Sequence, residues 1–82
     1  MKKETKPEEK LLAIKKLRCS FGYFSAVDMA NMLGKHGIKM SRQTYSNKES
    51  GRSKFTVQEI QALSEEFRMS LEDTIRFFND WD

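Results

Sequence analysis

Apolar residues recur along this chain at intervals of three and four, which is the spacing of one face of an α-helix. Short polar stretches with serine, threonine or glycine separate the apolar stretches. This pattern predicts an all-α fold of five helices. We expect the helices at about residues 8–20, 26–36, 42–50, 57–67 and 71–79.

Four of the five predicted helix starts carry an N-cap residue, whose side-chain oxygen can accept a hydrogen bond from a backbone N–H of the first turn. Three of these starts also have an acidic residue three positions later, the spacing of a capping box. The N-caps are Ser25, Ser41, Thr56 and Ser70, and the acids are Asp28, Glu59 and Asp73.

The second helix has two candidate ends, Gly34 and Gly37. We favour Gly37 because Ile38 follows it and would supply the apolar contact of a Schellman-type helix end.

Composition indicates a single small domain. The chain has 82 residues, with one proline and four glycines, too few turn residues for an all-β fold. Residues 1–7 are polar and lysine-rich, so we expect a flexible basic tail followed by one domain over residues 8–82. No apolar stretch is long enough to cross a membrane, and Cys19 has no cysteine to pair with, so we expect a cytoplasmic protein that does not bind membranes.

Charge is distributed unevenly around the net value of +3. Residues 35–54 carry six basic residues and one acid, whereas residues 55–82 carry seven acids and two basic residues. A chain of this kind can present one face to a polyanion and keep the other face away from it. An ordinary solvated surface would show the same pattern, so charge alone leaves both interpretations open.

The predicted third helix is too polar to serve packing alone, because Tyr45 is its only large apolar residue. Arg42, Gln43 and Asn47 carry forked side chains, each able to form two hydrogen bonds with a base edge in the DNA major groove. A short polar helix fits that groove. The turn that follows carries cations and small donors suited to phosphates: Arg52, Ser53 and Lys54.

This segment resembles the helix-turn-helix of the lambda-repressor and Cro-like (Xre) family. The shared pattern is an apolar helix ending Leu33-Gly34, then Ser-Arg-Gln-Thr from Ser41, an apolar residue, and Glu-x-Gly from Glu49. Leu17-Arg18 and the stretch over residues 55–73 extend the resemblance, which covers about residues 9–79. The ending Phe77-Phe78 is similar to small phage-encoded members.

The resemblance implies a compact five-helix domain that binds double-stranded DNA sequence-specifically and regulates transcription, as a repressor does. It also implies an ion pair between Arg18 and Glu49 that ties the third helix to the first. Base contacts would come from Arg42, Gln43, Thr44 and Asn47. Contacts with the DNA backbone would come from Lys39, Ser46, Lys48, Arg52, Ser53 and Lys54.

The chain departs from the family pattern in three places. Ala26 stands where the family usually has a glutamine that helps to grip a phosphate. Residues 35–39 are an insertion between the second and third helices, and the turn between the first and second helices is one residue longer. These departures leave open the angle at which the third helix would meet DNA.

Metal binding and catalysis find little support in the sequence. His36 is the only histidine and Cys19 the only cysteine, whereas a zinc site needs about four ligands. No nucleophile can be paired with a base, and no glycine-rich phosphate loop is present. We therefore expect no enzyme activity, no cofactor, no metal and no small-molecule substrate, and we interpret His36 as a surface residue.

Two alternatives to a transcription regulator that binds DNA directly remain. One is a protein-interaction module on the same fold, whose fourth and fifth helices contact a larger regulator or a polymerase. The other is an antitoxin that binds both DNA and a protein. Phe77 and Trp81, four residues apart, would either form the contact of a homodimer or cover the domain's own core.

Overall fold

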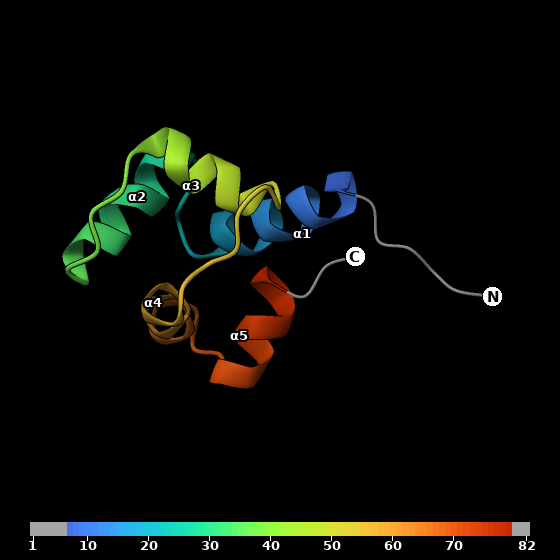
Figure 1. Cartoon of the computed structure of the whole chain (residues 1–82). Coiled ribbons are helices and arrows are strands. Elements are labelled where there is room, and N and C mark those ends of the chain that lie inside the picture. Colours follow the sequence, from blue (N-terminus) through green and yellow to red (C-terminus); the bar gives the residue numbers. More distant parts are fainter. Residues whose placement is uncertain (1–6, 80–82) are drawn as a thin grey trace.

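The computed structural model describes residues 7–79, and these form five α-helices and no strand (Figure 1). The prediction of an all-α fold is confirmed, with helix ends within about one residue of the expected positions. None of the described helices is long and apolar enough to span a bilayer. The helices are α1 (Pro7–Ser20), α2 (Ala26–Lys35), α3 (Arg42–Glu49), α4 (Val57–Phe67) and α5 (Leu71–Phe78).

The expected N-terminal tail lies mostly outside the described residues. Its last member, Pro7, is the first residue of α1 rather than part of a tail. Proline suits the first turn of a helix, where its missing N–H would have no partner in any case.

The core forms where the helices converge. Figure 1 shows α2 and α3 together at the top of the view, with α4 and α5 below them. α2 packs against α3, α4 against α5, and α1 against α3. Phe55, which lies between α3 and α4, joins the two pairs: its ring lies 5.9 Å from that of Tyr45 and 5.4 Å from that of Phe78. Side chains with no exposed surface include Ile14, Met29, Leu33, Tyr45, Leu63 and Phe78.

The four predicted N-caps are confirmed. Each cap hydroxyl accepts a hydrogen bond from the backbone N–H three residues further on. Complete capping boxes form at Ser25 and Thr56, where Asp28 and Glu59 accept a bond in return from the backbone N–H of the cap. Each cap stabilises its helix by about 1 kcal/mol.

The predicted end of α2 at Gly37 is also confirmed. Gly37 adopts a φ of 83°, in the left-handed region that favours glycine. The backbone N–H of Gly37 donates to the carbonyl of Gly34, and that of Ile38 donates to the carbonyl of Leu33, both at 3.0 Å. These two bonds define a Schellman motif, and Ile38 packs against the core as expected. The insertion therefore ends α2 tightly, with His36 as its C-cap.

Of three apolar residues that align along α5, Phe78 alone is buried in the core. Leu71 and Ile75, which align with Phe78 at helical spacing, remain 48% and 46% exposed. Thr74 is buried in their place. Its hydroxyl donates a 2.7 Å hydrogen bond to the carbonyl of Ser70, which satisfies the polar group without water. Two aliphatic side chains of α5, Leu71 and Ile75, are consequently exposed beside the charged side chains of Glu72, Asp73 and Arg76.

Candidate nucleic-acid interface

α3 is held in place by its inner face. Tyr45 and Glu49 lie four residues apart, so they point to the same side of the helix, and both are buried. A helix of eight residues is too short to be stable alone. The packing of these two side chains therefore determines how α3 is oriented.

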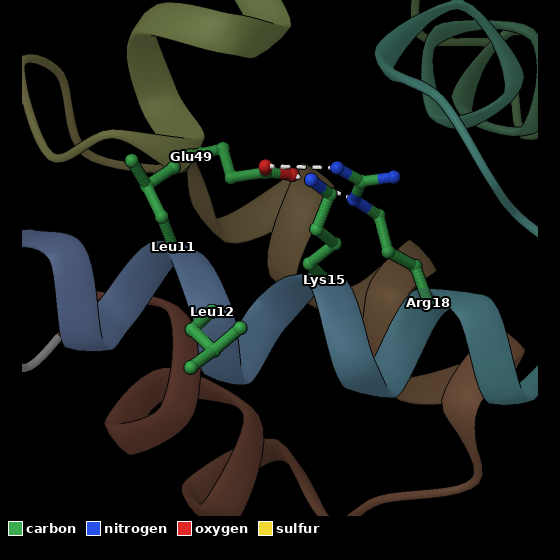
Figure 2. A pocket seen from close by; sticks show the side chains of 5 residues that line it. All are labelled: Leu11, Leu12, Lys15, Arg18 and Glu49. Carbon is green, nitrogen blue, oxygen red and sulfur yellow. Dashed lines mark hydrogen bonds and ion pairs between the residues drawn. The ribbon is translucent and has the colours of Figure 1, made fainter.

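Glu49 is buried as the partner of Arg18 on α1. The Nε of Arg18 donates to one carboxylate oxygen at 3.1 Å, and a terminal guanidinium nitrogen donates to the other at 3.2 Å. The two side chains are only 7% and 8% exposed. Figure 2 shows them pointing toward each other beside an open groove that is also lined by Leu11, Leu12 and Lys15. A two-bond ion pair fixes orientation as well as distance.

The Tyr45 hydroxyl lies near the same ion pair. It is buried, and among the described residues no hydrogen bond of regular geometry satisfies it. Burial raises the pKa of the Tyr45 phenol, and the negative charge of Glu49 raises that pKa further. Tyr45 therefore acts as a neutral packing residue beneath α3.

The outer face of α3 carries the side chains expected to contact bases. Arg42, Gln43 and Thr44 are exposed, and Asn47 is half-buried. The Gln43 amide nitrogen donates to the Asn47 side-chain oxygen at 3.2 Å, so these two amides form a pair on the helix surface. The hydroxyl of Thr44 accepts a 3.0 Å bond from the Ser41 hydroxyl. Three of the four expected base-reading residues are thus exposed, and the fourth, Asn47, is half-buried.

Two lysines expected at the DNA backbone have partners within the protein. The ammonium of Lys48 donates to a carboxylate oxygen of Glu59 at 2.8 Å, and the two side chains are 12% and 7% exposed. The ammonium of Lys54 donates to the backbone carbonyl of Asn79 at 2.8 Å. Nothing local in the sequence signals these pairings, because the partners are 11 and 25 residues apart.

The other expected backbone contacts remain accessible. Lys39, Arg52, Ser46 and Ser53 are exposed, and none of their side chains forms a hydrogen bond or ion pair with another of the described residues. Lys39 precedes α3, whereas Arg52 and Ser53 follow it, so the accessible cations stand at both ends of the helix.

The two expected dimer contacts have different outcomes. Phe77 is half-buried, and its ring lies 5.3 Å from that of Phe78, in contact with the core. Trp81 lies outside the described residues.

A second polar cluster, which sequence reasoning missed, joins α4 to the end of α2. The Tyr23 hydroxyl donates to one carboxylate oxygen of Glu66, and the other oxygen lies 3.0 Å from a ring nitrogen of His36. His36 is therefore a half-buried structural residue rather than a free surface residue. The hydrogen bond with Tyr23, and after it the one with His36, lowers the pKa of the Glu66 carboxyl. The hydrogen bond with Glu66 raises the pKa of the Tyr23 phenol.

Comparison with known proteins identifies no relative of this chain: no protein-family model, curated protein or solved structure matches it.

We predict that breaking the buried ion pair destabilises the protein strongly. Replacing Glu49 with Gln or Arg18 with Met leaves one buried charge without its counter-ion, which should cost about 3–5 kcal/mol of unfolding free energy in urea titrations. The matched control is Glu72→Gln, because Glu72 and Arg76 form an ion pair that is 80% and 66% exposed. Its loss should cost less than about 0.5 kcal/mol. Equal costs for the two pairs would contradict the prediction.

We predict that the Tyr23–Glu66 bond makes stability depend on pH. A lowered carboxyl pKa stabilises the fold above the unfolded value of 4.5, and this stabilisation is lost as pH falls through the lower folded-state pKa. Tyr23→Phe should therefore be less stable than wild type near neutral pH, with a difference that narrows in acid. In a Glu66→Gln background the same substitution should have an effect that no longer varies with pH. A variation that persists there would exclude Glu66 as its source.

Proposed function

We propose that this protein binds double-stranded DNA through the outer face of α3 and regulates transcription, with no catalytic activity. The observation that supports this most directly is the division of α3 into two faces. Tyr45 and Glu49 anchor one face, while the other presents arginine and amide side chains to solvent. The exposed polar side chains of α3 contribute little to packing, so a polar ligand accounts for them best.

The chemistry of this face suits base edges. Arg42 can donate two bonds to a guanine, and Gln43 or Asn47 can both donate to and accept from an adenine. Thr44 adds a hydroxyl that serves either base. Lys39 and Arg52 would neutralise phosphates on either side of the groove, and Ser46 and Ser53 would donate to them.

In this proposal α2 and α3 act as a helix-turn-helix of the lambda-repressor and Cro-like kind, and α3 enters the major groove. The Schellman end at Gly37 is consistent with it, because it makes the enlarged turn an ordered connection rather than a loose loop. Residues 38–40 then lead directly into Ser41, the N-cap of α3.

We also propose that two copies of the protein associate through the exposed face of α5 that carries Leu71 and Ile75, and so bind paired half-sites together. Leu71 and Ile75 are exposed there, flanked by Glu72 and Arg76. Around a two-fold axis, Glu72 of each copy can meet Arg76 of the other, so the face is complementary to itself. This assigns pairing to Leu71 and Ile75 in place of Phe77.

We predict that DNA recognition depends on Arg42 and Gln43. The preferred site is first selected from random duplex DNA, and binding is then measured at several salt concentrations. Arg42→Ala with Gln43→Ala should weaken binding to that site about 100-fold, because each two-bond base contact is worth about 1–3 kcal/mol. Binding to unrelated duplexes should weaken much less.

The matched control is Gln61→Ala with Arg68→Ala, which removes the same kinds of exposed side chain from α4 and from the turn that follows it. This variant should bind the selected site like wild type. If no duplex binds better than micromolar at low salt, or if both double variants bind equally, α3 is not a DNA reader. The protein-interaction module, or the antitoxin, would then be the better interpretation.

We predict that Ile75→Glu abolishes pairing, because it places two carboxylates together at the proposed axis. Wild type should sediment as a dimer, and the variant as a folded monomer that binds half-sites but loses the added affinity for paired sites. Val57→Glu is the matched control, since Val57 is an aliphatic residue of α4 that is 76% exposed. A monomeric wild type, or dissociation by both variants alike, would disprove this surface.

A further inference from the structure

The side chain of Asn79, the last described residue, forms a pair of hydrogen bonds with the backbone of Phe55, and we call this pair the clasp. The side-chain oxygen of Asn79 accepts a bond from the Phe55 N–H at 2.8 Å, and its side-chain nitrogen donates to the Phe55 carbonyl at 3.0 Å. One carboxamide therefore satisfies both backbone polar groups of a residue whose surface is only 4% exposed. Buried backbone groups of this kind need partners, because leaving them unpaired is costly.

The clasp holds one end of the α3–α4 connection, residues 50–56. The other end is tied to α3, because the backbone N–H groups of Arg52 and Ser53 both donate to the Asn47 carbonyl, at 2.9 and 3.3 Å. Lys54, next to the clasp, donates to the Asn79 carbonyl as well. The connection is thus hydrogen-bonded to α3 at one end and to the C-terminal end of α5 at the other.

The side chains of Arg52 and Ser53 are exposed to solvent. Their backbone forms the tie to α3, and the end held by Asn79 follows at Phe55. A side chain on a constrained backbone loses less conformational freedom when it meets a phosphate than one on a mobile loop does. The position of these groups relative to the outer face of α3 depends on both ties.

We propose that Asn79 is a positioning residue for DNA binding, through which the end of α5 holds Arg52 and Ser53 at the DNA backbone. This inference rests on the proposed function. It makes α5 part of the DNA-binding apparatus although its outer face is directed elsewhere. Asn79 itself would touch no DNA, and it would not alter the choice of base.

The test compares Asn79→Ala with Ser70→Ala, which removes the N-cap at the opposite end of the same helix. Both substitutions should lower the melting temperature. Binding to the selected duplex is therefore measured well below the melting temperature, at salt concentrations between about 50 and 200 mM. Asn79→Ala should flatten the dependence of log affinity on log salt by about one unit for each phosphate that the protein no longer neutralises. The preferred base sequence should stay the same, and Ser70→Ala should keep the wild-type slope.

A double-mutant cycle assigns the effect to the connection. In an Arg52→Ala background, Asn79→Ala should flatten the slope by less than it does in wild type, because part of the contact it positions is already missing. Wild-type slopes in Asn79→Ala, or equal flattening in Ser70→Ala, would overturn the inference while leaving specific DNA binding intact. Absence of duplex binding by the wild-type protein would instead refute the proposed function.

Discussion

The buried ion pair between Arg18 and Glu49 is the constraint on which the arrangement of this protein depends. α3 has one large apolar side chain, Tyr45, and a single packed side chain would leave a short helix free to rotate about its own axis. The pair adds a second anchor one turn further on, and its two-bond geometry resists rotation. Arg18 also donates to the carbonyl of Tyr23 at 3.4 Å, so α1, α3 and the turn before α2 meet at one guanidinium.

Most of the fold could be predicted from the sequence because its signals are local. N-cap serines and threonines mark four helix starts, and Gly37 followed by Ile38 marks the end of α2. The face of α5 could not be predicted by the same reasoning. Leu71 and Ile75 have the apolar character of core residues, but the hydroxyl of Thr74 bonds to its own helix and can be buried instead. Hydrophobicity alone does not register a polar group that is satisfied locally.

In the candidate site, too, the local sequence pattern predicts some features and not others. The exposure of Gln43 and Thr44 follows from helical spacing once Tyr45 and Glu49 face inward. The exposure of Arg42 does not, because Arg42 lies three residues before Tyr45 at the first position of the helix. The partners of Lys48 and Lys54 do not follow from spacing, because they come from α4 and from the end of α5. The Tyr23–Glu66 bond joins residues 43 positions apart. Contacts of this range are set by how helices pack, and the residue pattern along a single helix does not encode them.

These pairings change what the basic segment can offer to a polyanion. Glu49, its only acid, is neutralised by Arg18 from outside the segment, while Lys48 and Lys54 are engaged with protein oxygens. The remaining exposed cations of residues 35–54 are Lys35, Lys39, Arg42 and Arg52. Four such charges neutralise few phosphates, so under the proposed function the affinity of one copy for arbitrary DNA would be small. Discrimination would rest on the forked side chains of α3, and useful affinity on a second copy that brings a second α3 to the same duplex.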